Sequence, residues 1–188
     1  MSISLRNTLP TLLLFACAVM LALGLNTAKA QTADSKMMVN KSDRMFFEKA
    51  AASGMFEVKA GEVAASKASN MEVKALGEMM VKDHDEANDK LMALAKSKGV
   101  SLPTTLDKEH ADMLMKLQQG PAGMAFDEMY IEQMDKGHKK TIALFEDAGK
   151  STDADIASFA KMTLPTLKHH HEMVMRLEKM MDSTPKSR

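Results

Sequence analysis

Four ionisable residues stand where apolar side chains are expected, one in each of four long amphipathic segments. They are Glu57, His84, His138 and His170, and each fills a gap in a run of apolar residues at helical spacing. An isolated ionisable group in a protein core is costly, so a buried set of this kind needs a partner. Imidazole and carboxylate groups together suit zinc, iron or copper. The pattern therefore predicts a core site for one transition-metal ion, with one ligand from each segment.

Three consecutive histidines occur in the last of these segments, and a helix can direct only one of them squarely toward a core. The apolar run that includes Leu167 continues at Val174, and its missing member falls at His170. We therefore expect His170 to face inward, with His169 and His171 on the flanks of the helix.

A structural role for the same four residues is the alternative. The layer would then be a hydrogen-bonded cluster in which the Glu57 carboxylate pairs with one or more histidines and fixes how the helices align. The protein would be a non-enzymatic envelope stress or interaction protein. The sequence contains no glycine-rich phosphate loop and no nucleophile elbow, so it indicates no organic cofactor and leaves open whether the protein is an enzyme.

The composition favours helices as the elements that position these residues. Alanine, lysine, glutamate, methionine and leucine are abundant, whereas tryptophan is absent and glycine and proline are scarce. Helical periodicity, together with start and stop signals, predicts long helices at about 43–67, 71–98, 124–149 and 156–181, and a short one between Pro103 and Gly120.

The lengths of the connections predict the topology. The first and third long helices are each followed by a tight connection, whereas a long connection with the short helix joins the second to the third. Short connections give antiparallel neighbours, and the long one allows a crossover along the bundle. We therefore expect an all-α, ferritin-like four-helix bundle with this crossover. Such a bundle brings the four ionisable residues to within roughly 5 Å of one level along its axis.

Residues 1–30 have the layout of a secretory signal peptide. A basic start precedes an apolar run, and small residues precede a cleavage position after Ala30. The single cysteine, Cys17, lies inside this segment, so the mature chain would have no disulfide. We predict a periplasmic protein. The alternatives are a membrane anchor formed by an uncleaved N-terminus and lipidation of Cys17.

The rest of the chain is expected to form one domain. We predict a flexible leader at 31–41, the bundle at 42–182 and a disordered tail at 183–188. The net charge is zero and the sequence has no basic stripe, so we do not expect nucleic acid as a partner. No stable membrane insertion is expected after signal cleavage. The expected partner is a metal ion, and a homo-oligomer is compatible with the sequence.

Several stretches together resemble one protein family. They are GMFEVKAGEVA (54–64), MVKDH (80–84), FDEMY (126–130), His138, and the Leu164-Pro165 pair that precedes His170 by five positions. This combination resembles the exported family catalogued as domain of unknown function 4142, across roughly Asp43 to Met181. The resemblance implies a ferritin-like four-helix bundle and no established activity. The residues that it marks are Glu57, Asp83, His84, Asp127, Tyr130, His138 and His170.

The pattern departs from that of a di-iron ferritin. Such centres take a glutamate from each of two helices and a Glu-x-x-His pair from each of the other two. Here only His138 has an acidic residue three positions before it, Asp135, so one metal ion or none fits better than a di-iron centre. Asp83, Asp127, Tyr130 and Asp135 are candidates for a supporting role around the ligands. For Asp127, a simpler interpretation is an acid in the first turn of a helix, where the helix dipole favours it.

Methionine is unusually frequent, with 20 residues in the chain. Met80, Met134 and Met173 each lie about one helical turn from a candidate ligand. Thioethers suit Cu(I), fill irregular helical cores and take up oxidants reversibly. The sequence leaves these three uses open.

Overall fold

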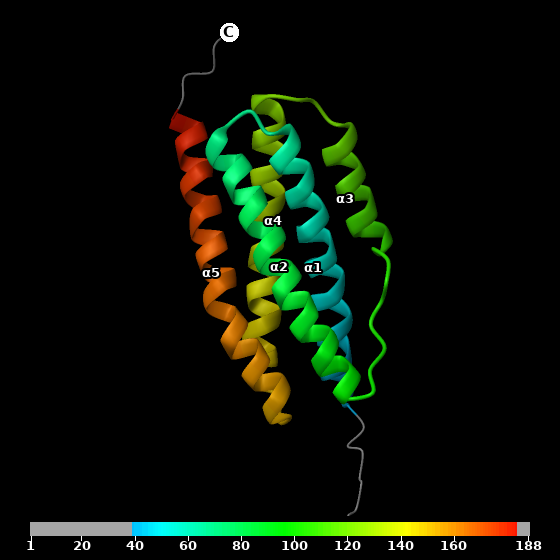
Figure 1. The fold of residues 1–188 in the computed structure, drawn as a ribbon. Helices are drawn as coiled ribbons and strands as arrows, with labels where there is room; N and C mark the ends of the chain where they lie inside the picture. Colours follow the sequence, from blue (N-terminus) through cyan, green and yellow to red (C-terminus); the bar gives the residue numbers. More distant parts are fainter. Residues whose placement is uncertain (1–38, 184–188) are drawn as a thin grey trace, which may run out of the picture. The chain divides into compact units, whose positions relative to one another are not determined.

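Residues 39–183 are described by the computed structural model, and they form five helices (Figure 1). The helices are α1 (Lys41–Lys67), α2 (Met71–Ser97), α3 (Lys108–Gln119), α4 (Met124–Ala148) and α5 (Ala154–Ser183). Because these residues contain no strand, the predicted all-α class is confirmed. The predicted signal peptide, most of the leader and the end of the tail lie outside the described residues.

The four long helices form a bundle in which each helix packs against two antiparallel neighbours. α1 contacts α2 and α4, and α5 contacts the same two helices from the other side. α2 and α4 both start at the end of the bundle that carries the α1–α2 turn (Figure 1). The crossover between them carries α3 along the outside, beside α1. The predicted crossover topology is therefore confirmed.

The start of α3 differs from the sequence-based expectation. The helix begins at Lys108 rather than near Pro103. Asp107 is the cap, because its carboxylate accepts a hydrogen bond from the backbone N–H of His110 at 2.9 Å. The proline lies in the extended part of the crossover instead of opening the helix.

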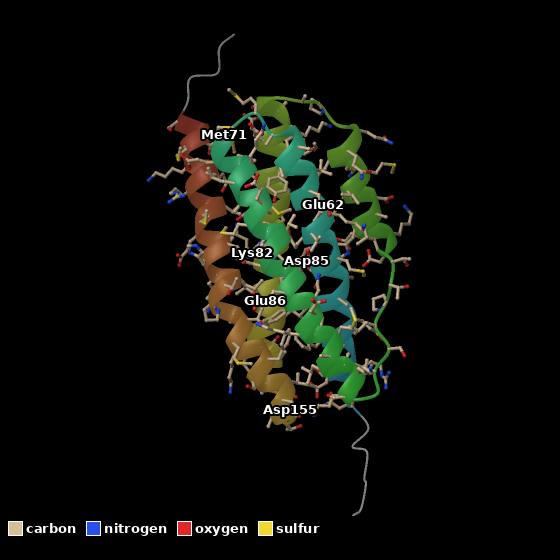
Figure 2. The ribbon with its side chains drawn as sticks, in the orientation of Figure 1. Glu62, Met71, Lys82, Asp85, Glu86 and Asp155 are labelled. Carbon is tan, nitrogen blue, oxygen red and sulfur yellow. The ribbon has the colours of Figure 1, made fainter. Side chains whose placement is uncertain are left out.

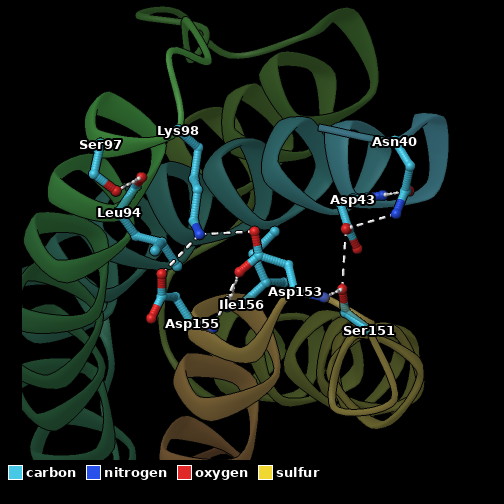
Figure 3. A network of polar contacts seen from close by, with 9 residues as sticks. All are labelled: Asn40, Asp43, Leu94, Ser97, Lys98, Ser151, Asp153, Asp155 and Ile156. Carbon is cyan, nitrogen blue, oxygen red and sulfur yellow. Dashed lines mark hydrogen bonds and ion pairs between the residues drawn. The ribbon is translucent and has the colours of Figure 1, made fainter. Parts of the chain in front are cut away.

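A polar network closes the end of the bundle that carries the α4–α5 turn (Figure 3). The Lys98 ammonium lies 2.7 Å from carboxylate oxygens of both Asp153 and Asp155. In the same network, Asp43 of α1 accepts hydrogen bonds from Asn40 at 2.8 Å and from Ser151 at 2.9 Å. These contacts join the start of α1 and the end of α2 to the α4–α5 turn.

At the opposite end, one lysine holds the crossover helix against α1. The Lys67 ammonium donates hydrogen bonds to the carbonyl oxygens of Leu117, Gln118 and Gly120 at 2.7 to 3.0 Å. These carbonyls belong to the C-terminal turn and cap of α3, where a helix has unsatisfied acceptors and a negative dipole end. The single cation therefore fixes the end of α3.

Two glycines let α1 and α2 approach closely. A Cβ on Gly61 would come within 2.6 Å of the Gly77 carbonyl oxygen, and a Cβ on Gly77 within 2.8 Å of the Gly61 oxygen. Both distances are shorter than any van der Waals contact that a methyl group could make. Only glycine fits on both sides of this contact.

The core consists of two hydrophobic clusters, one at each end of the bundle. The α1–α2 end of the core, nearest the α1–α2 turn, contains Tyr130 and two fully buried methionines, Met80 and Met134. Five more methionines pack against it: Met79, Met113, Met129, Met173 and Met181. The α4–α5 end of the core contains four phenylalanines and aliphatic residues, and none of its described members is a methionine. Between the two clusters, each long helix contributes one of the four ionisable residues predicted from the sequence.

Candidate metal centre

All four predicted site residues are buried, each on a different long helix. Glu57, His84, His138 and His170 are exposed by 5% or less. The neighbours of His84 on α2 show why: Lys82, Asp85 and Glu86 point outward (Figure 2), which leaves His84 on the inner face. In the triplet, His170 is buried, His169 is exposed and His171 is intermediate. The prediction of which residues face the core is confirmed.

The three imidazoles converge. Each histidine places a ring nitrogen within 4.8 Å of the other two, and the ring centroids are 5.3 to 5.9 Å apart. Three nitrogens bound to one tetrahedral zinc ion would lie about 3.4 Å from one another, given a Zn–N distance of about 2.0–2.1 Å. From the observed spacing, a small inward movement of the rings would reach that value.

His138 is held in one orientation by its own helix. Its Nδ1 lies 2.9 Å from the Met134 carbonyl oxygen, which can only accept, so Nδ1 carries the hydrogen. Nε2 therefore keeps its lone pair, and it is buried without a hydrogen-bond partner. Burial, followed by repulsion from His170, lowers the pKa of His138 to about 4, so the ring is neutral near pH 7.

His170 is held in the same way by Asp83. Nε2 of His170 lies 3.0 Å from a carboxylate oxygen of Asp83, to which it donates, and Nδ1 is buried without a partner. Burial lowers the pKa of His170, although Asp83 acts in the opposite direction. A histidine that gives one ring N–H to a carboxylate and presents the other nitrogen is a common arrangement at metal sites.

His84 is the least constrained of the three. Its Nε2 is buried without a partner, and the described residues supply no hydrogen bond to either of its ring nitrogens. Burial, then repulsion from His138 and His170, lowers its pKa well below the usual value. All three histidines are therefore neutral at pH 7, which is the form that binds metal ions.

Glu57 lies beside the three nitrogens rather than among them. Its Oε1 is 3.8 Å from Nδ1 of His138, which is too long for a hydrogen bond, and its Oε2 is buried without a partner. Burial raises the pKa of Glu57 to about 8, so the carboxyl group is protonated at neutral pH. Gly137 makes room for it, because a Cβ there would lie 3.2 Å from Oε1.

Tyr130, marked by the family resemblance, is fully buried near this carboxyl group. Its hydroxyl group has no hydrogen-bond partner among the described residues. Burial, followed by the charge of Glu57, raises its pKa well above the usual value. Tyr130 therefore lies in the α1–α2 end of the core, close enough to Glu57 for the two groups to interact electrostatically.

Two of the acidic candidates are occupied elsewhere. Asp127 accepts hydrogen bonds from the backbone and hydroxyl of Ser69 and from the Asn70 backbone, so it fastens the α1–α2 turn to α4. Asp135 lies on the flank of α4 and accepts hydrogen bonds from His171 at 3.0 Å and Lys139 at 2.7 Å. Burial acts to raise the pKa of Asp135, but these two hydrogen bonds outweigh it and hold the pKa below its usual range.

Sequence reasoning missed the pairing of His171 with Asp135 and the position of Gly137 against Glu57. Neither has a signal in the spacing of one helix alone, because both depend on how neighbouring helices rotate about their axes. The Asp83–His170 contact agrees with the supporting role expected for Asp83, but the sequence did not indicate which histidine it would contact.

The family profile of domain of unknown function 4142 (DUF4142) matches residues 28–177. This chain belongs to the DUF4142 family. The match confirms the resemblance found in the sequence. No curated protein matches the DUF4142 chain.

Among solved structures, the chain is similar in fold to a DUF305 fragment from Deinococcus radiodurans. The TM-score is 0.66 at 11% sequence identity, over 76% of this chain and 98% of the fragment. At this identity the similarity concerns the fold alone, and it agrees with the helical architecture described above.

Proposed function

We propose that this protein binds one transition-metal ion, zinc, iron or copper, in the core of the bundle. His84, His138 and His170 supply the nitrogen ligands. Glu57, which is protonated at neutral pH when no ion lies beside it, would lose its proton as the ion binds and supply the negative charge, either as a fourth ligand or from its place beside His138. The protein is exported to the periplasm, where it serves in metal handling or in the response to envelope or oxidative stress.

The observation that carries this proposal is that most of the buried polar atoms without a hydrogen-bond partner belong to the four site residues. Buried polar groups in proteins are almost always hydrogen-bonded, and exceptions need an explanation. Among the described residues, six buried side-chain atoms have no hydrogen-bond partner, and four of them belong to the four site residues: Glu57, His84, His138 and His170. A metal ion would bind all three histidines together, since each ring places a nitrogen within 4.8 Å of the other two.

The structural alternative is less well supported by the same observation. A layer that fixed helix alignment through hydrogen bonds would pair the Glu57 carboxyl group with an imidazole. Instead, the nearest pair, Glu57 and His138, is 3.8 Å apart, and the His138 hydrogen is directed to Met134. Three neutral imidazoles that bring unpaired nitrogens close together repel one another, so the convergence of the three histidines does not stabilise the fold by itself.

The proposal is tested by the metal content of the mature protein. It should be purified from its native compartment without an affinity tag or chelator and analysed by mass spectrometry. We expect about one equivalent of a single metal, and loss of that metal in His170→Ala. Metal-free protein that also fails to bind zinc, copper and iron in titrations would overturn the proposal.

Thermal unfolding separates a metal site from a structural layer. A ligand that binds only the folded state raises stability in proportion to the logarithm of its concentration over its Kd. The correct metal should therefore raise the melting temperature of the wild type, and His138→Ala should remove that rise. His169→Ala is the matched control, because His169 is an exposed neighbour on the same helix as His170 and should leave the rise unchanged.

A further inference from the structure

A small cavity lies against the candidate metal centre, on the side of the α4–α5 end of the core. It has a volume of about 20 Å³ and is lined by residues from all four long helices. A cavity of roughly 10–15 Å³ on this measure is sufficient for one water molecule. The cavity therefore has room for one water or a molecule of two small atoms.

His84 is part of both the candidate centre and the cavity wall. The other lining residues lie one to three helical turns from the site residue on their own helix, all in the same direction along the bundle. Gly54 precedes Glu57 by three positions, Thr141 follows His138 by three and Leu167 precedes His170 by three. The cavity therefore occupies the core level next to the three imidazoles.

The cavity wall offers hydrogen bonds. The hydroxyl oxygens of Ser53 on α1 and Thr141 on α4 are 3.0 Å apart, so one hydroxyl donates to the other. The pair keeps one free O–H donor and several free lone pairs. Asn88 also lines the cavity, with its amide oxygen against Gly54, where a Cβ would lie 2.0 Å from it. An apolar cavity of this size stays dry, whereas one with several polar groups takes up water.

We propose that this cavity receives the non-protein ligand of the metal centre, a water molecule or another molecule of one or two heavy atoms, hydrogen-bonded to the Ser53–Thr141 pair. The inference rests on the proposed function. Glu57 lies beside His138 and outside the group of three converging nitrogens. With Glu57 in that place, three histidines leave a coordination position free, and an open position distinguishes reactive metal sites from closed, purely structural ones. The centre is then an open site that binds small exogenous ligands.

Copper(II) in water enriched in oxygen-17 provides the test. Cu²⁺ binds nitrogen and oxygen sites more tightly than the other divalent first-row ions, so a site that holds zinc or iron also holds Cu²⁺. Pulsed electron paramagnetic resonance of the protein loaded with one equivalent of Cu²⁺ detects the hyperfine coupling of a coordinated oxygen-17. We expect this coupling in the wild type and its loss in the double variant Ser53→Ala/Thr141→Val. Removing both hydroxyls together leaves neither without its partner.

Thr163→Val is the matched control. Thr163 lines the same cavity, but its hydroxyl already donates to the Phe159 carbonyl oxygen of its own helix at 2.9 Å. The variant should retain the coupling. If the double variant does not fold, Thr141→Val alone is the second variant. It leaves the Ser53 hydroxyl in place, so we expect the oxygen-17 coupling to change in size rather than to vanish, and an unchanged coupling would overturn the assignment.

The outcomes separate the two proposals. Copper bound without oxygen-17 coupling in the wild type would overturn the open site and leave the metal site standing. Coupling of equal size in the wild type and the hydroxyl variant would overturn the assignment of the ligand to this cavity. Wild-type protein that does not retain Cu²⁺ would overturn the metal site itself and, with it, this inference.

Discussion

The two ends of the core contain different types of residue, and the layer of Glu57 and the three histidines lies between them. At the α4–α5 end, Phe46, Phe145 and Phe159 form a triangle of aromatic contacts with centroids 5.1 to 6.3 Å apart. At the α1–α2 end, seven methionines surround Tyr130 and the stacked Phe126. Aromatic rings have few rotamers and preferred packing angles, whereas methionine is flexible and adapts to irregular gaps. The comparison indicates a rigid end and an adaptable end, with the candidate ligands at their boundary.

The largest effect is expected from a truncation at the rigid end. Phe46→Ala should lower the free energy of unfolding by about 3–5 kcal/mol, because it removes a buried ring from the aromatic triangle and leaves a cavity. Urea unfolding of the metal-free protein measures this change. A loss below about 1.5 kcal/mol would mean that this end repacks as easily as the methionine-containing end.

The boundary between the two ends should show a pH effect of its own. Glu57 has its pKa raised to about 8 in the folded protein, against an ordinary value of 4.5. The folded state therefore keeps a proton that the unfolded state releases, and the stability from this group, complete below pH 4.5, is lost as the pH rises toward 8. In Glu57→Gln this loss is absent. The stability of the variant minus that of the wild type should increase by roughly 1.4 kcal/mol per pH unit between pH 5 and 7.

Urea unfolding of both metal-free proteins at several pH values measures this difference. Glu62→Gln is the control, because Glu62 is an exposed residue of the same helix (Figure 2) and should show no such slope. A flat difference between Glu57→Gln and the wild type would mean that the carboxyl group is ionised when buried.

Lys67 and Lys98 fasten helices at opposite ends of the bundle, so the stability that each contributes can be compared. Lys67→Met should cost about 1.5–3 kcal/mol, since it removes a charged donor from three carbonyl groups. Lys98→Met should cost about 1 kcal/mol, because Asp155, one of its two carboxylate partners, is largely exposed. The Lys98 effect should shrink in 1 M salt and the Lys67 effect should not. Unfolding at low and high salt tests this, and equal salt sensitivity would contradict the distinction.

The smallest effect is expected from a conservative change at the adaptable end. Met80→Leu should lower the free energy of unfolding by less than about 1.5 kcal/mol, although Met80 is fully buried, because the volumes match and the neighbouring methionines adjust. The same variant tests whether the thioether binds copper. Unchanged affinity for Cu(I) in a competition titration is expected if the sulfur only fills space, and a drop of tenfold or more would assign it as a ligand.

The inward residues could be predicted because helical periodicity fixes which side of a helix each residue occupies. His170 was separated from His169 and His171 on this ground alone, and the length of the crossover then brought His84 and His138 to the same level. The prediction failed at the start of α3, where Pro103 resembled a helix start but the capping carboxylate of Asp107 decided the boundary.

Other features lie beyond the reach of the sequence because they depend on contacts between helices. Asp127 of α4 hydrogen-bonds to the α1–α2 turn, and a cavity lies beside His84. Both features follow from the rotation and spacing of neighbouring helices. The segregation of methionine to one end of the core is visible only after the antiparallel order of the helices is known.

The crossover divides the bundle into two helical hairpins, and this division has a kinetic consequence. Glu57 and His84 belong to the first hairpin, while His138 and His170 belong to the second. Each hairpin closes through local contacts, which form early, but the ligand set is complete only after the two dock, a contact of long sequence separation. A metal ion bound by ligands from both hairpins would thus stabilise the docked state alone. Slow release of the ion would report on how often the hairpins come apart.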